Sequence, residues 1–235
     1  MTKGSNKRMN KIVPLIILVV ILLGLMKINF NSPELAVAKQ HDGTDSFVEQ
    51  VGRGGGEWID NAGDPIFDNE IVSPPPRIKE DSYARVLGSH IAADGSEKWI
   101  EVDLSDFKLY AWEGSRKVYE FPISTGRRGY KTVTGEFRVW SKVRLQAYRG
   151  GSRERGDYYY LPNVPYSLFF YKGYAIHGAY WHNDFGIKNR SSGCVNLRIP
   201  DAEKIYNWAG PAIQPGTGAI RSTPDNPGVR VVVHD

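Results

Sequence analysis

Short runs in which polar and apolar residues alternate fill the chain from Glu97 onward. Lys98–Leu104 is the clearest of them, and this alternation is typical of a strand with one buried face and one exposed face. Glycine- and asparagine-rich turns separate the runs, which favours many short strands. The pattern therefore limits this part of the chain to a mainly β fold, either a sandwich or an open barrel.

The predicted elements are seven strands and one helix. Pro200–Trp208 is the helical segment, because Asp201 is placed to begin a helix and the apolar residues that follow share one face. Glu113–Ser115 is predicted to form a hairpin turn between two of the strands. The strands are predicted at Lys98–Leu104, Phe107–Trp112, Val118–Ile123, Glu136–Val143, Tyr166–Tyr171, Tyr174–His177 and Val229–Val233.

The N-terminus predicts attachment to a membrane. Residues 1–11 are basic, and a continuous apolar run follows at residues 12–26. A membrane span needs about 20 apolar residues, so we expect an anchor over residues 12–30, with Lys27 reaching the interface. A signal peptide cleaved after Ala38 is the alternative. In either case the basic end stays in the cytoplasm and the rest of the chain lies outside.

The net charge of +4 comes from this N-terminus. The first thirty residues hold five basic residues and no acidic one, which leaves 25 basic against 26 acidic residues in the rest of the chain. A nucleic-acid-binding domain would need a basic face on its folded part, so we expect no nucleic-acid partner. Residues 31–96 are rich in glycine, proline and polar residues, and we expect an extracytoplasmic linker there.

Cys194 is the one cysteine of the chain, so an intramolecular disulfide is excluded. A lone cysteine is often an inert core residue. Here, however, it follows His177 by 17 positions, and His177 ends a predicted strand. A strand and a returning segment can bring the two side chains together, and a thiol needs such a base to become a nucleophile. Gly193 gives the backbone freedom to direct N–H groups at a developing oxyanion.

Two motifs resemble the signature of the L,D-transpeptidase (YkuD) family. Ile176-His177-Gly178 is the first, and Ser192-Gly193-Cys194-Val195-Asn196 is the second. The resemblance runs from about Glu97 to the C-terminus and includes Ser124–Gly126 and Thr134–Gly135. It implies that Cys194 is the nucleophile, that His177 is the general base and acid, and that the Gly178 carbonyl orients the imidazole. It further implies an oxyanion and substrate region at Gly193, Ser192 and Asn196, and we expect the loop residues His182 and Trp181 to lie near the substrate cleft.

Two positions depart from the family pattern. Ser192 stands where the family usually has a histidine, and Val133 where it usually has a proline. The first departure lies directly beside Gly193 and the nucleophile, so it bears on activity more than on fold. A serine can still donate or accept one local hydrogen bond.

The resemblance implies a catalytic domain at residues 97–235 with an L,D-transpeptidase-type β fold. Its substrates would be peptidoglycan stem peptides, which it would cross-link through a cysteine acyl-enzyme without a cofactor. Hydrolysis of the same acyl-enzyme would make the protein an L,D-carboxypeptidase. A wall-binding module that has lost its chemistry is the alternative outside the enzymes. The expected location outside the cytoplasm suits each of these functions.

Other cysteine and histidine chemistries fit the sequence less well. His177, His182 and Cys194 could be three zinc ligands with water as the fourth, but the family resemblance uses His177 and Cys194 without a metal. Sortases have a histidine far upstream of the cysteine and an arginine well after it, and Arg198 lies too close to Cys194. Papain-like and NlpC/P60-type peptidases have the cysteine before the histidine, which is the reverse of the order here.

Overall fold

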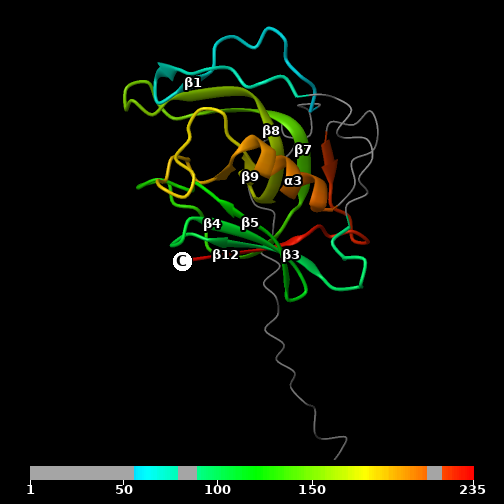
Figure 1. The fold of residues 1–235 in the computed structure, drawn as a ribbon. Helices are drawn as coiled ribbons and strands as arrows, with labels where there is room; N and C mark the ends of the chain where they lie inside the picture. Colours follow the sequence, from blue (N-terminus) through cyan, green and yellow to red (C-terminus); the bar gives the residue numbers. More distant parts are fainter. Residues whose placement is uncertain (1–55, 79–88, 211–218) are drawn as a thin grey trace, which may run out of the picture. The chain divides into compact units, whose positions relative to one another are not determined.

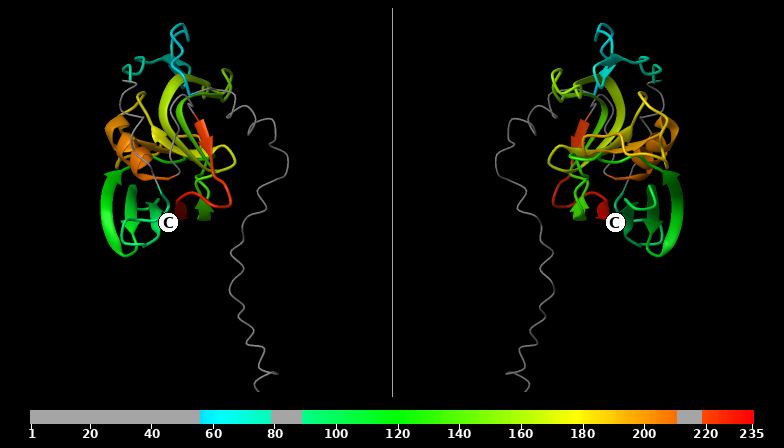
Figure 2. Two further views of the ribbon diagram at one scale, coloured as in Figure 1. Left: turned by 90° about the vertical axis from the view of Figure 1, so that its right-hand side faces the viewer. Right: turned by 90° about the vertical axis from the view of Figure 1, so that its left-hand side faces the viewer.

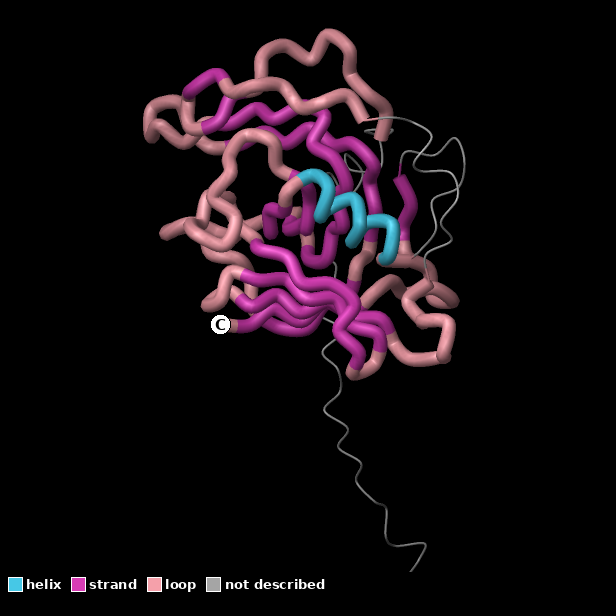
Figure 3. Tube along the Cα trace, viewed as in Figure 1, coloured by secondary structure: helices cyan, strands magenta, loops and turns pink. Residues whose placement is uncertain are grey.

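The computed structural model describes residues 56–78, 89–210 and 219–235 (Figure 1). Strands dominate these ranges, and α3 (Ile199–Trp208) is the one α-helix in them, as Figure 3 shows. The predicted mainly β fold with one short helix is therefore confirmed. None of the helical structure in these ranges is long and apolar enough to cross a membrane. The anchor expected at residues 12–30 lies outside the described residues.

The first sheet is organised around one long strand, β8. One edge of β8 pairs with β7, and β7 pairs in turn with β11. The other edge pairs with β9 and, further along, with β1, while β10 lies beside β9 and β2 beside β1. The strands are β1 (Ile66–Phe67), β2 (Glu70–Ile71), β7 (Ser141–Gly150), β8 (Tyr159–Tyr171), β9 (Tyr174–Gly178), β10 (Val195–Leu197) and β11 (Ala219–Arg221).

The second sheet has the order β5-β4-β3-β12-β6. Its C-terminal strand pairs in parallel with β3, where Val231 lies opposite Ile100, and antiparallel with β6. The last residues of the chain are thus built into the middle of a sheet. The strands are β3 (Lys98–Asp103), β4 (Lys108–Glu113), β5 (Arg116–Pro122), β6 (Gly135–Arg138) and β12 (Arg230–His234).

The main core lies between the two sheets and includes the apolar face of α3, which contacts β8 and β9 (Figure 2). Each sheet contributes alternate residues, so the alternation in the sequence corresponds to one buried face per strand. The five-stranded sheet supplies Ile100, Val102, Leu109, Ala111, Val231 and Val233. The first sheet supplies Leu168, Phe170, Ile176, Val195 and Leu197, and α3 supplies Ala202, Ile205 and Tyr206.

The single strand predicted at Glu136–Val143 is two strands, and they belong to different sheets. The chain crosses between the sheets at Val139 and Trp140. The Val139 N–H donates to the Val229 carbonyl, and the Trp140 N–H donates to the Phe169 carbonyl in the other sheet. The three-residue strands β10 and β11 were not predicted, because so short a segment carries no periodicity of its own.

Residues 56–78, which we call the strap, were assigned to the linker by composition, but in the structure they are bound to the first sheet. The Asn163 side chain accepts a hydrogen bond from the Ile59 N–H at 2.9 Å and donates one to the Ile59 carbonyl at 3.0 Å. The Tyr160 hydroxyl donates to the Ala62 carbonyl at 2.7 Å, and Ile66 pairs with Tyr160 in β8. These partners lie about a hundred positions along the chain, so composition alone could not reveal them.

We expect Asn163→Gly to loosen the strap at Ile59. Asn163 has a φ of 55°, which glycine adopts without strain, so the substitution removes the two hydrogen bonds and little else. Loss of about 1–3 kcal/mol predicts amide exchange at Ile59 at least about fivefold faster in hydrogen-exchange measurements, since about 1.4 kcal/mol is a factor of ten. Amides of β3 serve as the internal control. Unchanged exchange at Ile59 would contradict the pairing of Asn163 with the strap.

Candidate active site

Parallel pairing of β9 with β10 brings the two sequence motifs together. His177 lies directly opposite Asn196, while their neighbours Ile176 and Val195 point into the main core. Because side chains alternate along a strand, His177 and Asn196 lie on the face away from that core. Cys194 precedes Asn196 by two positions and shares its face.

A small apolar cluster forms around Cys194 on this second face. Val143, Phe169 and Ala175 are its buried members, and Trp140, Tyr148, Cys194 and Ala219 pack against them. The Tyr148 ring lies 4.9 Å from the His177 ring, centroid to centroid, and its hydroxyl donates to Ser167 Oγ at 2.9 Å. The cluster therefore gives the imidazole and the thiol a common apolar wall. Tyr148 was not singled out in the sequence, where it carries no motif.

A chain of four hydrogen bonds determines which ring nitrogen of His177 carries the proton. A carbonyl can only accept, so His177 Nδ1 donates to the Gly178 carbonyl at 3.1 Å. His177 Nε2 is then an acceptor and receives Asn196 Nδ2–H at 3.2 Å. Asn196 Oδ1 lies 3.3 Å from His182 Nε2, and the Asp184 N–H donates to His182 Nδ1 at 3.3 Å. The nitrogen that could take a proton from a thiol is thus Nε2. Its lone pair already accepts the hydrogen bond from the Asn196 side-chain amide.

Cys194 sits at the end of a tightly closed turn. The Ser191 hydroxyl donates to the Cys194 carbonyl at 2.5 Å and accepts the Gly193 N–H at 3.0 Å. The Gly193 N–H is therefore engaged inside the turn. The thiol lies 3.8 Å from the Gly173 carbonyl. Within the described residues, the thiol makes no hydrogen bond to His177.

Glycine is required at position 193 for two reasons. Its φ is +121°, and a Cβ there would lie 2.5 Å from Cε1 of Tyr174. The Gly193 carbonyl accepts a hydrogen bond from the buried Thr132 hydroxyl at 2.8 Å, and Thr132 Oγ1 accepts the Gly126 N–H at 2.9 Å. This buried link connects the cysteine turn to Ser124–Gly126.

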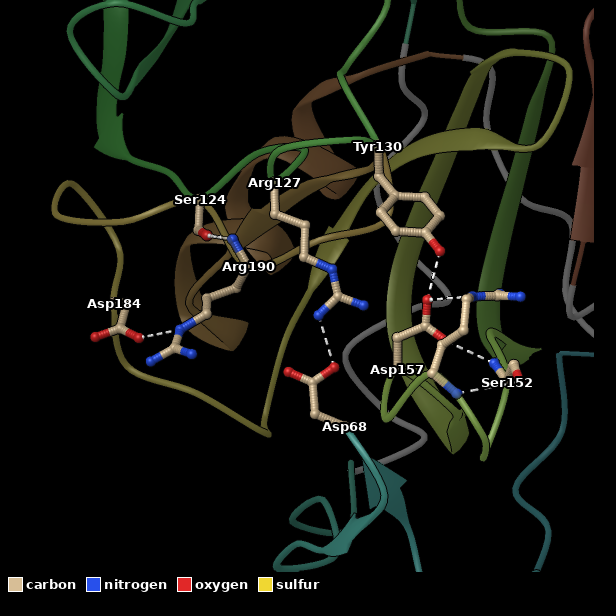
Figure 4. Close-up of polar contacts among 9 residues, drawn as sticks. Asp68, Ser124, Arg127, Tyr130, Ser152, Asp157, Asp184 and Arg190 are labelled. Carbon is tan, nitrogen blue, oxygen red and sulfur yellow. Dashed lines mark hydrogen bonds and ion pairs between the residues drawn. The ribbon is translucent and has the colours of Figure 1, made fainter.

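The Ser124–Gly126 segment supports the cysteine loop along its length. Ser124 and Asn196 exchange backbone hydrogen bonds, and the Ser191 N–H donates to the Thr125 carbonyl at 3.0 Å. Figure 4 shows the Ser124 hydroxyl beside the Arg190 backbone and Arg190 Nε bonded to Asp184 at 2.5 Å. The loop between the two motifs is thereby fixed at its C-terminal end and, through the Asp184–Arg190 ion pair, in its middle. Gly135, of the Thr134–Gly135 landmark, begins β6.

The remaining predicted residues surround this arrangement. The Trp181 ring lies 5.8 Å from the His177 ring, and its buried indole N–H has no hydrogen-bond partner among the described residues. His182 reaches the site through Asn196, as described above. Ser192 is half-buried, and its hydroxyl makes no hydrogen bond within the described residues. The described residues contain no group of three or more His, Cys, Asp or Glu side chains that could hold a metal ion.

Burial keeps both reactive side chains neutral in this arrangement. It lowers the pKa of His177 to about 4, although the hydrogen bond to the Gly178 carbonyl acts in the opposite direction. It raises the pKa of the Cys194 thiol to about 11. Part of the Cys194 residue is exposed, but its side chain packs against the apolar cluster, which explains the direction of the shift. At neutral pH the pair is therefore thiol and imidazole rather than thiolate and imidazolium.

A model of the L,D-transpeptidase catalytic domain (YkuD) matches residues 97–233, which is more than half of the chain. YciB of Bacillus subtilis, itself provisionally assigned as an L,D-transpeptidase, is 26% identical over 126 residues, covering 46% of this chain and 59% of its own.

Solved structures give similar coverage. An L,D-transpeptidase from Mycobacterium smegmatis is 20% identical, with a TM-score of 0.49 and coverage of 60% of each chain. L,D-transpeptidase 3 from Mycobacterium tuberculosis, in complex with a faropenem-derived adduct, is 24% identical with a TM-score of 0.48. That match covers 60% of this chain and 61% of the other. The chain thus spans about three fifths of the length of these relatives.

The neutral pair predicts how Cys194 reacts with a simple alkylating agent. A pKa of about 11 leaves a thiolate fraction on the order of 10⁻⁴ at pH 7. Because only the thiolate reacts, the rate with iodoacetamide should rise about tenfold per pH unit between pH 7 and pH 10. Mass spectrometry at timed intervals measures it, with N-acetylcysteine as the reference thiol. A rate that reaches its plateau below pH 8 would instead indicate a preformed thiolate–imidazolium pair.

Proposed function

The chain belongs to the L,D-transpeptidase catalytic domain (YkuD) family, and we propose that it cross-links peptidoglycan stem peptides through an acyl-enzyme on Cys194. The observation that carries the proposal is the β9–β10 pairing. It sets His177 and the Cys194 side chain on one face, beside a shared apolar wall. The Gly178 carbonyl holds His177 in the tautomer whose Nε2 can accept a proton. Cysteine acyl transfer needs a base that can come within hydrogen-bond reach of the thiol, and a shared face with the correct tautomer supports this role for His177.

In the proposed reaction His177 Nε2 takes the Cys194 proton, and the sulfur attacks the carbonyl of the diamino acid in a tetrapeptide donor. The tetrahedral intermediate collapses to a thioester, and the imidazolium gives its proton to the departing D-alanine amine. An amine of a second stem then attacks the thioester, and its surplus proton passes to His177. The thiol is released and an amide bond joins the two stems. Attack by water in this last step gives the L,D-carboxypeptidase outcome.

The reaction requires Asn196 to release His177. Its amide now donates to the same Nε2 that must accept the thiol proton, so the two interactions exclude each other. Hydrogen bonds between catalytic groups are often absent or long before substrate binds. A donor peptide that packs over Cys194 and draws the Asn196 amide to itself would free the base. Asn196 is in this view a positioning residue, because its side-chain amide holds the His177 and His182 rings in fixed positions relative to each other.

A second candidate function is a wall-binding module without catalysis. The observations that favour it are the serine at position 192, the high pKa of the Cys194 thiol and the missing hydrogen bond between Cys194 and His177. Such a module would keep the β scaffold and bind stem peptides without turnover. A free thiol outside the cell is open to oxidation, which argues against its retention in a protein that only binds.

The proposed function requires a location outside the cytoplasm. The basic residues 1–11 and the apolar segment at residues 12–30 would supply it by anchoring the chain with the domain on the wall side. We propose this arrangement on the sequence pattern alone, with secretion after cleavage at Ala38 as its alternative.

A carbapenem distinguishes the two candidate functions. The full-length protein should gain the mass of the β-lactam on Cys194, because an activated thiol opens the strained ring. Cys194→Ala should show no adduct, and His177→Gln should react about 10²–10⁴-fold more slowly, the usual contribution of a general base. Intact-protein mass spectrometry measures all three. Absence of an adduct on the folded wild-type protein, while iodoacetamide still labels Cys194, would favour the wall-binding module.

A further inference from the structure

The strap contains a hairpin whose tip reaches the rim of the site. Phe67 and Glu70 pair across a two-residue turn, in which Asp68 and Asn69 have φ values of 52° and 66°. Two positive φ values in sequence characterise the turn type that two-residue hairpins favour, and asparagine and aspartate adopt it readily. The Asn69 N–H donates to the Tyr158 carbonyl at 3.1 Å, and its side chain donates to the Arg153 carbonyl at 2.8 Å. The tip therefore has two anchors that do not involve the Asp68 carboxylate.

The Asp68 carboxylate is bonded to Arg127, with Nη1 and Oδ1 2.6 Å apart (Figure 4). Arg127 follows Ser124–Gly126, and its N–H donates to the Ser191 carbonyl at 3.0 Å. Its guanidinium stacks over the Tyr130 ring at 5.3 Å, and the Tyr130 hydroxyl is bonded to Asp157. The guanidinium thus sits on a fixed platform that is attached to the turn carrying Cys194.

The Arg127 side chain retains unused binding capacity. A guanidinium has several N–H donors in a planar fork suited to carboxylates, and within the described residues only Nη1 is engaged, by one oxygen of Asp68. The two side chains are 22% and 34% exposed. The pair is therefore partly buried but still reachable from solvent, and a carboxylate that replaces Asp68 has to form an equivalent charge-assisted pair with Arg127.

Ring contacts connect the strap tip to His177 through Trp181. The Phe67 ring lies 6.0 Å from the Trp181 ring, which lies 5.8 Å from His177. Tyr159 lies within electrostatic range of both Arg127 and Cys194. Burial raises the pKa of Tyr159, negative charge on Cys194 would raise it further, and Arg127 lowers it. The geometric link between Arg127 and the thiol is the Ser191 carbonyl, which accepts the Arg127 N–H and belongs to the turn that carries Cys194.

We propose that Arg127 binds a carboxylate of the donor stem peptide and that Asp68 of the strap occupies Arg127 until that carboxylate replaces it. The proposal rests on the proposed function, because it takes the stem peptide as substrate. It assigns the strap, which lies outside the residues matched by the family model, to the substrate-binding site. Arg127 becomes a residue that determines specificity, and Asp68 an internal competitor for it.

The test is binding of a stem tetrapeptide to the full-length Cys194→Ala protein, measured by calorimetry so that no chemistry intervenes. Three probes are compared: the free tetrapeptide, the peptide amidated at its terminal carboxylate, and the peptide amidated at the carboxylate of its second residue. Each is titrated again into Cys194→Ala/Arg127→Gln. One of the two amidations should weaken binding at least about tenfold with Arg127 present, and less than about twofold without it, as expected for loss of a charge-assisted pair.

Asp68→Asn in the Cys194→Ala background is the matched variant, because asparagine accommodates the same positive φ. It should strengthen binding of the free tetrapeptide severalfold and leave the Arg127-dependent amidated peptide unaffected. The inference is overturned if neither amidation depends on Arg127, if the tetrapeptide does not bind, or if Asp68→Asn weakens binding as Arg127→Gln does. Wild-type protein that shows the expected binding pattern but releases no D-alanine would refute the proposed reaction and leave this recognition intact.

Discussion

The parallel pairing of β9 with β10 is the constraint on which the rest of the site depends. It places His177 opposite Asn196 and brings Cys194, 17 residues away in sequence, to the same face. The other faces of the two strands hold Ile176, Val195 and Leu197 in the main core. A slip by one residue would bury His177 and expose these apolar side chains, so core packing fixes the register. The positions of the reactive groups therefore follow from hydrophobic burial on the opposite side of the sheet.

If the protein is the proposed acyltransferase, the structure represents a resting state of its site. Asn196 holds the basic nitrogen of His177, burial keeps the thiol protonated, and the turn around Gly193 is closed by Ser191. Each of these contacts would have to give way to a substrate contact during acyl transfer. In such a site the β scaffold sets the positions of the side chains, and substrate binding would bring the thiol and the base together. The strap fits this view, because its Asp68 occupies a cationic side chain at the rim of the site.

Much of the fold could be predicted from the sequence. Each sheet packs one face into the main core, so apolar and polar residues alternate along its strands and indicate where the strands lie. β3, β4, β9 and the helix were predicted nearly to their bounds. The crossing at Val139 and Trp140 was missed, because apolar residues continue through it and only long-range hydrogen bonds separate the two strands. The strap was missed for a related reason. Its glycines and prolines are typical of a linker, and its partners Asn163 and Tyr160 lie far along the chain.

The residues of the candidate site likewise fall into those that the sequence indicated and those that only the structure revealed. Residues in a local motif, such as His177, Gly178, Gly193 and Cys194, could be singled out from the sequence. Tyr148, Thr132 and Arg127 could not, because each acts through a contact between distant segments. Nor does any motif indicate that Asn196 bridges His177 and His182, since this follows from strand register and loop path together.

The most direct test of the account is to incubate the full-length protein with a stem tetrapeptide and measure D-alanine release and intact protein mass in the same samples. The account predicts that D-alanine appears together with a tripeptide thioester on Cys194, and that both are lost in Cys194→Ala and strongly reduced in His177→Gln. Release that persists without Cys194, or a folded wild-type protein that forms no adduct and releases no D-alanine, would contradict it.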